Sequence, residues 1–417
     1  MQIDVTSKPV AVPLGIVWLV ALGAGLVGLA LRLTSGHELA NYTSSIPWGL
    51  WIAAYVYFMG LSMGLFLVSA VAYVYRLERL LPFIKLGLLA SLVSLLAGLL
   101  TIWLDLGHMG RFYTVYTRGS TGSMMAWLIW MYTAYAILLV AVSWLVVRVD
   151  LAERASGDDL KGRLAGLLAL GRKDTGEASR ESDRRNARML FMIGIPLAIA
   201  TAGGSGALFG VVGARHYWNA PLMPILFIVS AMTSGTALLA LLVALFARGR
   251  QREVGEQALL FLGRALLGLV VVYALLLWAE FSVTLYADIP ASSEAAYQVL
   301  GGPYPWVFWV FQVALGTMIP LSILLLRPRS AGWVGLAGLL VAVSFLATRL
   351  NIVIPGFVEP QLAGLDTAYT DTRLEYEYFP SVMEWLVLVF TGAFAAGLFA
   401  LGLRTLPVLE ESKETAS

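Results

Sequence analysis

Long apolar stretches separated by short polar segments repeat along the whole 417-residue chain. Several are long enough to cross the hydrocarbon core of a bilayer as α-helices, which takes about 20 residues each. Ten such stretches occur, at residues 13–33, 48–75, 82–104, 123–147, 189–212, 221–246, 261–286, 304–326, 331–348 and 382–404. The pattern therefore predicts an all-α, polytopic membrane protein with about ten transmembrane helices.

The composition agrees with this prediction and narrows the chemistry. Hydrophobic residues make up 59% of the chain and charged residues only 13%, whereas soluble domains average about 25% charged residues. The chain has no cysteine, which excludes an Fe–S cluster, a thiolate metal site, a disulfide and covalently attached haem in this chain. With only three histidines and a net charge of +2, we expect neither haem nor a nucleic-acid partner. Any redox chemistry must then belong to a bound small molecule.

The basic residues predict the orientation of the chain. Cytoplasmic segments of membrane proteins are enriched in Lys and Arg. If the N-terminus is cytoplasmic, only six of the 28 Lys and Arg residues fall on the outer side: Arg32, Arg111, Arg118, Arg215, Arg349 and Arg373. We therefore expect both termini in the cytoplasm.

The connections between the apolar stretches differ in character. The segment LKGRLAGLLALGRK in the cytoplasmic connection 149–188 reads either as a short amphipathic helix on the membrane surface or as a solvated linker. The outer connection 350–381 is long, acidic and aromatic, and the shorter outer connection 287–303 carries only acidic charges. Because long ordered loops usually have a function, we expect 350–381 to dock an extrinsic subunit.

Two of the apolar stretches resemble each other. In both, a proline (Pro47 or Pro221) precedes a cluster of small residues, Gly60–Gly64 or Ser234–Gly235, by thirteen or fourteen residues. This similarity predicts a single membrane domain, residues 1–417, that contains two four-helix bundles. The first and tenth helices would lie at its periphery. The bundles would fall within 34–147 and 189–348. The alternative, that Pro and Gly are simply common in membrane helices, stays open.

Ionisable residues inside apolar stretches are informative, because each costs about 2.5–3.5 kcal/mol to insert unless it is paired or hydrated. Asp105 ends the third stretch, and His108 and Arg111 follow at i+3 and i+6, on roughly one face if the helix continues. Glu280 lies within the seventh stretch. Arg349 closes the ninth stretch and Glu384 opens the tenth. The predicted topology places all of them in the outer half of the membrane.

These residues predict a polar pocket with an aromatic rim. The rim would be formed by Trp48, Trp51, Tyr113, Tyr116, Trp278 and Tyr376. Such a pocket suits a small amphipathic ligand that enters from the lipid. Quinone reduction requires hydrogen-bond donors and two protons, which groups of this kind supply. The plain alternatives are helix caps at Asp105 and Glu384, an interfacial histidine at His108 and structural ion pairs at Arg111 and Arg349.

Four segments carry a resemblance to a known family. They are PWGLWIAAYVYFMGLSMG, ASLVSLLAGLLTIWLDLGHMGRFY, ATRLN and YFPSVMEWLVLVFTGAFAAGLFALGLRTLP. In this order the chain resembles the NrfD/PsrC superfamily, and within it the ten-span, HybB-like branch. The resemblance implies a haem-free, quinone-reactive subunit of a respiratory complex in the bacterial inner membrane. It also implies menaquinone or another quinone as cofactor, and as partners a periplasmic ferredoxin-like Fe–S subunit and a catalytic subunit.

The resemblance also implies roles for individual residues. Asp105, Glu280 and Arg349 match polar positions of the family, whereas His108 and Arg111 match less closely. On this interpretation Asp105 and His108 exchange protons with a quinone oxygen, Arg349 keeps Asp105 or Glu280 ionised, and Glu280 leads to a path for proton translocation. Trp48, Arg111, Tyr113 and Glu384 would help to bind the ring. Several relatives carry a carboxylate near the start of the fourth span, where this chain has Trp127, and a proton route through that acid is therefore in doubt.

Two other functions fit the sequence formally. A secondary transporter also has many spans, a repeat and buried charges, although its site should lie near the midplane with broken helices. A non-catalytic anchor would only hold an extrinsic complex on the membrane, and it has no need for a buried Glu280.

Overall fold

The computed structural model describes residues 8–155, 160–172, 174–247, 252–358, 360, 362, 364–368, 371 and 373–408. All regular elements within these residues are helices, and ten helical segments among them are long and apolar enough to cross a membrane. This confirms the predicted fold class. The long helices are α1 (Lys8–Ser35), α2 (Leu50–Val74), α3 (Ile84–Asp105), α5 (Met124–Arg154), α7 (Glu177–Gly210), α8 (Met223–Phe246), α9 (Arg252–Ala287), η4 (Val307–Met318) continued by α11 (Ile319–Leu326), α12 (Ala331–Val353) and α15 (Val382–Thr405).

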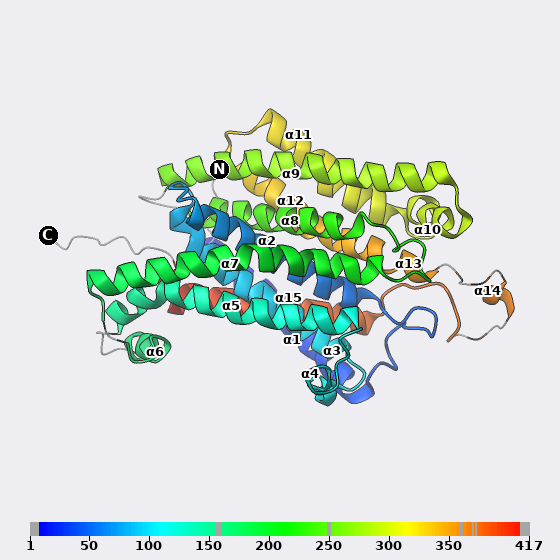
Figure 1. Cartoon of the computed structure of the whole chain (residues 1–417), viewed down its shortest axis with the longest axis horizontal. Helices are drawn as coiled ribbons and strands as arrows, with labels where there is room; N and C mark the ends of the chain where they lie inside the picture. Colours follow the sequence, from blue (N-terminus) through cyan, green and yellow to red (C-terminus); the bar gives the residue numbers. More distant parts are fainter. Residues whose placement is uncertain are drawn as a thin grey trace.

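The long helices lie side by side, so the molecule has two ends (Figure 1). We call them the Asp105 end, where α3 ends and α15 begins, and the Arg148 end, where α5 connects to α7. Short helices cover both ends: η1 (Leu81–Phe83), η2 (Met109–Arg111), α4 (Thr114–Thr117), α6 (Leu160–Leu168), α10 (Pro290–Gly301), α13 (Pro355–Val358) and α14 (Leu365–Ala368). Of these, α10 falls in the outer connection 287–303, which the apolar pattern had left without a helix.

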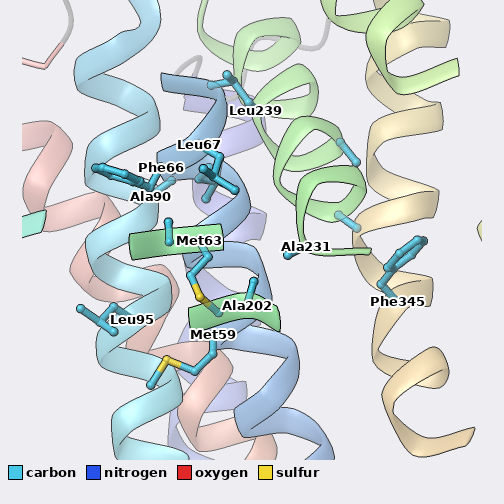
Figure 2. Close-up of a cluster of buried hydrophobic side chains, with 14 of the residues drawn as sticks. Met59, Met63, Phe66, Leu67, Ala90, Leu95, Ala202, Ala231, Leu239 and Phe345 are labelled. Atoms are coloured by element: carbon cyan, nitrogen blue, oxygen red, sulfur yellow. The ribbon is translucent and has the colours of Figure 1, made fainter. Parts of the chain in front are cut away.

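Helix α2 is the centre of the packing, and it contacts α3, α7, α8 and α12. Figure 2 shows Met59, Met63 and Phe66 of α2 among side chains of these neighbours, which include Leu95, Leu239 and Phe345. Helices α2, α3, α5 and α7 form one group, in which each helix contacts two of the others, and α8, α9, η4–α11 and α12 form a second group around α12, while α1 packs on α15. The domain boundaries at 34–147 and 189–348 stay a prediction, because α2 and α8 join the two groups over a broad contact.

The two small-residue clusters meet where α2 crosses α8. A methyl group added at Gly64 would overlap the backbone carbonyl of Ala231, and one added at Gly235 would overlap the backbone of Gly64. Only glycine permits this approach, as in other membrane helix pairs with small residues at the contact. At this crossing α2, the second membrane-spanning helix, packs against α8, the sixth, and so joins the two groups of helices.

The connection at the Arg148 end is more ordered than a linker. Helix α7 begins at Glu177 rather than near 189, and α6 forms within LKGRLAGLLALGRK. Ala165 and Ala169 of this segment pack on Leu151 and Ala152 of α5, and α6 is seen end-on where the long helices run across the view (Figure 1). The amphipathic helix is thus present, and its contact with a membrane surface stays a prediction.

Candidate functional site

Asp105 is the last residue of α3. The next residue, Leu106, has extended backbone angles (φ −64°, ψ 129°), and Gly107 follows it, so the helix does not continue. His108 and Arg111 therefore do not share a helical face with Asp105; they lie in or beside the short turn η2 and are exposed. The expectation that these three residues form one stripe was wrong, because the chain turns away at Leu106.

The partners of Asp105 come from the start of the chain. The Tyr42 hydroxyl donates to the Asp105 carboxylate at 2.8 Å. Arg32 of α1 is 3% exposed and donates to the carbonyls of Leu104 at 2.7 Å and Leu106 at 2.8 Å, which holds its charge beside Asp105. In the sequence, Arg32 was considered only as one of the basic residues that predict the orientation of the chain. Its position inside the first apolar stretch is the signal that could have marked it as a site residue.

Glu384 is completely buried at the start of α15. Its carboxylate accepts from the Tyr378 hydroxyl at 2.7 Å and, as part of a capping box, from the backbone N–H of Ser381 at 3.1 Å. The backbone N–H of Asn41 donates to its other oxygen at 3.3 Å. The helix cap is thus real, and Glu384 also lies near enough to Asp105 for their charges to interact.

Two tyrosines therefore link two acids at the Asp105 end. We call this the acid–tyrosine cluster, which consists of Arg32, His37, Tyr42, Asp105, Tyr378 and Glu384. Burial first, and then the neighbouring Asp105, raises the pKa of Tyr42 well above its usual value. Burial and the adjacent Glu384 raise the pKa of Tyr378 in the same way. Both hydroxyls therefore keep their protons and act as hydrogen-bond donors to the carboxylates.

His37 completes the aromatic side of this cluster. Its ring lies 5.6 Å from that of Tyr42 and 5.8 Å from that of Trp51. Its Nε2 atom is buried and has no hydrogen-bond partner among the described residues. Burial, and then the charge of Arg32, lowers the pKa of His37, although an interaction with the backbone of Asp105 partly opposes this. His37 is therefore held neutral in the folded protein at pH values where a free histidine is already protonated.

This shift predicts a pH dependence of stability. The unfolded chain takes up a proton at His37 near pH 6.5, before the folded protein does. The free energy of unfolding should then fall as the pH drops below about 6.5, until His37 is also protonated in the fold. In His37→Phe this component should vanish from thermal midpoints measured between about pH 7.5 and 5. His108→Phe, at an exposed position, is the matched control, and identical pH profiles for wild type and His37→Phe would refute the assignment.

Arg349 lies in a second polar group inside the bundle. It is 2% exposed and donates through Nη2 to the Ser230 hydroxyl at 2.6 Å, and its guanidinium lies 4.3 Å from the ring centre of Phe227. Its Nη1 has no hydrogen-bond partner among the described residues. Within the described chain neither Asp105 nor Glu280 forms an ion pair with Arg349, so the expected pairing was wrong; Arg32 is the cation beside Asp105.

Glu280 is half-buried on α9 and does not join the acid–tyrosine cluster. Tyr217 lies close enough to Glu280 to be influenced by its charge. Burial is the larger cause that raises the pKa of Tyr217, and the charge of Glu280 raises it further. The Tyr217 hydroxyl donates to the backbone carbonyl of Asn351 at 3.0 Å. Glu280 is thus associated with the contact between Tyr217 and Asn351, whereas the groups that act on Asp105 are Tyr42 and Arg32.

Asn351 ends a chain of side-chain hydrogen bonds that is partly buried at Asn351 and buried beyond it. Its amide donates to Gln312 at 2.6 Å, the Gln312 amide donates to the Tyr273 hydroxyl at 2.9 Å, and Tyr273 pairs with Thr348 at 3.2 Å. Gln312 lies in the π-helical segment η4, where Thr317 donates to the Gln312 carbonyl, five residues earlier. Segments of this type are rare and often occur at functional sites. Sequence periodicity gave no sign of this segment.

Two hollows adjoin these groups. An apolar cavity of about 600 Å³ is lined by residues of α10, η4, α12 and the segment before α15, and Asn351 and Tyr378 are among them. A polar recess at the Asp105 end is lined by His37, Tyr42 and Tyr378. The rings of Tyr304 and Phe379, 5.4 Å apart, border both hollows. Tyr378 is thus a shared wall between an apolar cavity and a polar recess.

The remaining predicted residues are distributed more widely. Trp48 packs against Trp218 and Phe357 and lines neither hollow. Tyr113 is 53% exposed and Trp278 is 70% exposed, so neither forms a rim around Asp105. Trp51 and Tyr376 do adjoin the site: Trp51 packs on Tyr42, and Tyr376 lines the apolar cavity.

Residues 38–361 match the family described as polysulphide reductase, NrfD. The chain is 36% identical over 396 residues to a selenate reductase subunit of Mesobacillus selenatarsenatis, and the match covers 94% of this chain and 92% of that protein. It is 28% identical to the Hdr-like menaquinol oxidoreductase integral membrane subunit of Archaeoglobus fulgidus, over 89% of this chain and 88% of that protein. It is also 28% identical to a putative membrane subunit of dimethyl sulfoxide reductase from Halobacterium salinarum, over 94% and 90% of the two chains.

Proposed function

Because the chain belongs to the polysulphide reductase NrfD family, we propose that it is the quinone-reactive membrane subunit of a reductase complex. In this function it exchanges electrons between a menaquinone-type quinone and an Fe–S subunit docked at the Asp105 end. The relatives are named as subunits of a selenate reductase, a menaquinol oxidoreductase and, as a putative subunit, a dimethyl sulfoxide reductase, which supports a place in a multi-subunit complex. The catalytic subunit would carry out the other half-reaction.

The observation that carries the proposal is the acid–tyrosine cluster beside the two hollows. A quinone supplies two-electron chemistry that is coupled to two protons. The chain's own contribution is to hold and move protons, and Tyr42 and Tyr378 are protonated hydroxyls already bonded to Asp105 and Glu384. A proton placed on either carboxylate lies one hydrogen bond from a tyrosine that lines a hollow. His108 and Glu280 lie outside this cluster, so the proposal assigns proton exchange to Asp105 and Glu384.

The polar recess supports docking of the partner at the same end. It contains Arg373, Glu375 and Glu377 beside Tyr42 and Tyr378, a mixed-charge surface suited to an extrinsic subunit. The distribution of Lys and Arg supports the assignment of this end to the periplasmic side of a bacterial inner membrane, with both termini in the cytoplasm. The segment 350–381 would form part of the contact, although several of its residues lie outside those described.

Substitution of Asp105 tests the proposal. In the complex purified from its native membrane, Asp105→Asn should reduce quinol-linked turnover at least about a hundredfold, because positioned proton-transfer groups contribute about 10²–10⁴-fold. Subunit composition should be unchanged, and Asp288→Asn, an exposed acid at the same end that lines neither hollow, should retain wild-type turnover. The wild type should also bind a fluorescent hydroxyquinoline N-oxide, a quinol analogue, with saturation. Absence of saturable binding would overturn the proposal, and loss of the complex in Asp105→Asn would show that Asp105 has a structural role instead.

A further inference from the structure

Helix α5 has one face that meets lipid. Ile137 and Val140 are 66% and 56% exposed, and Trp144 follows Val140 after four residues, so all three share one face of the helix. This part of α5 belongs to a membrane-spanning segment, whose exposed surface faces hydrocarbon. Trp127 and Trp144 lie about 26 Å apart along α5, close to the hydrocarbon thickness of about 30 Å. Because tryptophan is enriched at the edges of the hydrocarbon, Trp144 marks its edge at the Arg148 end.

Helix α6 covers the continuation of this face. Leu151 lies two turns beyond Trp144 on the same side of α5, yet it is only 1% exposed, since Ala165 and Ala169 pack against it. The Trp144 indole donates to the Leu168 carbonyl at 3.0 Å, which joins the end of α6 to the residue at the hydrocarbon edge. Figure 1 shows α6 end-on beside the end of α5, with its axis across the long helices. Helix α6 therefore lies on the lipid-facing side of α5, at the level of the phospholipid headgroups.

The outward surface of α6 is apolar. Leu164, Leu167 and Leu168 follow the i, i+3, i+4 spacing that forms one stripe on a helix, and they are 38%, 73% and 44% exposed. Leu170, in the turn after the helix, is 73% exposed as well. Transfer of leucine from water to an apolar environment is favourable. Four neighbouring exposed leucines at the hydrocarbon edge therefore favour insertion between lipid chains.

The charges of this segment complement an anionic surface. Residues 160–173 include four basic residues and no acidic one. Arg163 is exposed and adjoins the leucine stripe in sequence, and the Arg172 guanidinium lies 5.6 Å from the ring centre of Trp144. A guanidinium beside a tryptophan at the hydrocarbon edge lies at the depth of the phospholipid phosphates, to which arginine offers paired N–H donors. Helices with leucines on one side and basic residues on the other bind anionic bilayers in this way.

From these features we infer that α6 binds anionic phospholipids of the leaflet at the Arg148 end, the cytoplasmic one in the proposed orientation. Its leucines lie among the acyl chains, and Arg163 and Arg172 bind the phosphates. A zwitterionic phospholipid has the same phosphate but no net charge, so the basic residues favour lipids such as phosphatidylglycerol. The interaction holds the connection between α5 and α7 on the bilayer. It is independent of the proposed function, because the acid–tyrosine cluster lies at the opposite end.

A single fluorescent label on α6 tests its depth. The chain has no cysteine of its own, so Leu167→Cys directs one label to this stripe in the purified full chain, reconstituted in nanodiscs of phosphatidylglycerol and phosphatidylcholine. Phospholipids spin-labelled on the upper acyl chain should quench it at least threefold more strongly than a label at Glu177→Cys. Glu177 is exposed and begins α7 about 9 Å before Asp183. Iodide in the water should quench in the reverse order, and a Leu167 label that only iodide quenches would overturn the inference.

Photoreactive phosphatidylglycerol and phosphatidylcholine test the class of lipid. Phosphatidylglycerol should label wild-type peptides within 144–172 more strongly than phosphatidylcholine does. Arg163→Gln/Arg172→Gln should reduce that labelling at least fivefold. Arg184→Gln/Arg185→Gln removes the same charge from exposed positions at the same end, and should leave the labelling unchanged.

Each contrary result overturns a defined part of the inference. Equal losses in the two double variants would show a general attraction to positive charge, and equal labelling of the wild type by the two lipids would show apolar contact alone. Loss of lipid quenching at Leu167→Cys when the chain is in its complete complex would identify a partner subunit as the occupant of α6. Thermal midpoints show whether a variant is folded. Quinol-linked turnover tests the proposed function separately, since no readout of lipid binding depends on it.

Discussion

Replacing Gly235 by alanine is expected to prevent most of the protein from reaching its folded form. The added methyl group would overlap the backbone of Gly64 and Leu65, where α8 crosses α2. Extra methyl groups in a packed core typically cost about 1–3 kcal/mol when side chains can adjust. Here both contacting elements are helix backbones at the centre of the bundle, so we expect a loss of at least about 3 kcal/mol. The yield of monodisperse protein and its thermal midpoint in detergent measure the effect.

The chain offers a matched control of opposite sign. Gly268 lies within α9, and a methyl group added there would have no neighbouring atom within 4 Å. Because alanine favours a helix over glycine by about 0.8–1.0 kcal/mol, Gly268→Ala should leave the protein unchanged or stabilise it slightly. Equal behaviour of the two variants would mean that α2 and α8 do not approach as closely as the structure shows.

The second large effect is expected at the Arg148 end. Arg148 is 1% exposed, and its guanidinium forms an ion pair with Asp183 of α7. It also donates to the Ser179 hydroxyl at 2.6 Å and to the backbone carbonyl of Asp174 at 3.0 Å. In Arg148→Met the Asp183 carboxylate stays buried without its partner. Breaking a buried pair in this way costs about 3–5 kcal/mol, which denaturation in mixed detergent micelles would measure.

Two comparisons isolate the ion pair. Arg184 lies on the same helix as Asp183 and pairs with Glu177 and Glu181, but its side chain is 62% exposed. Arg184→Met should therefore cost no more than about 1 kcal/mol. The double variant Arg148→Met/Asp183→Leu should recover much of the loss, because it removes the unpaired charge as well. A loss in Arg148→Met no larger than in Arg184→Met would refute the importance of the buried pair.

At the candidate site, the sequence indicated the two acids but not the residues that bind to them. Asp105 and Glu384 stood out because a charge in an apolar stretch is costly, and the structure brings these two together. Their partners Tyr42 and Tyr378 lie in connections, where tyrosine is unremarkable, so no local pattern marked them. His108 and Arg111 were placed beside Asp105 by assuming that the helix continues, and one extended residue, Leu106, undoes that assumption.

The small-residue clusters of α2 and α8 likewise show that the sequence revealed single features but not which of them are in contact. The sequence showed Gly60–Gly64 and Ser234–Gly235 as similar features of two helices and suggested a repeat. In the structure they pack against each other, since Gly64 lies against Ala231 and Gly235. The similarity of the two clusters along the chain did not by itself indicate that they contact each other in space.

The sequence alone determined the number of spans, their limits to within a few residues in most cases, and the absence of cysteine chemistry. These properties follow from local quantities, namely the length of an apolar run and the identity of single residues. Each segment meets the requirements of the bilayer or of a cofactor independently of the other segments. The tertiary structure decided which cation lies beside Asp105, which helices cross at Gly64, and where the apolar cavity lies. Each of these depends on how distant segments pack, and in a chain with so many apolar helices many pairings bury similar surfaces. Only the fitted shapes of the helices, and the need to satisfy each buried polar group, select among them.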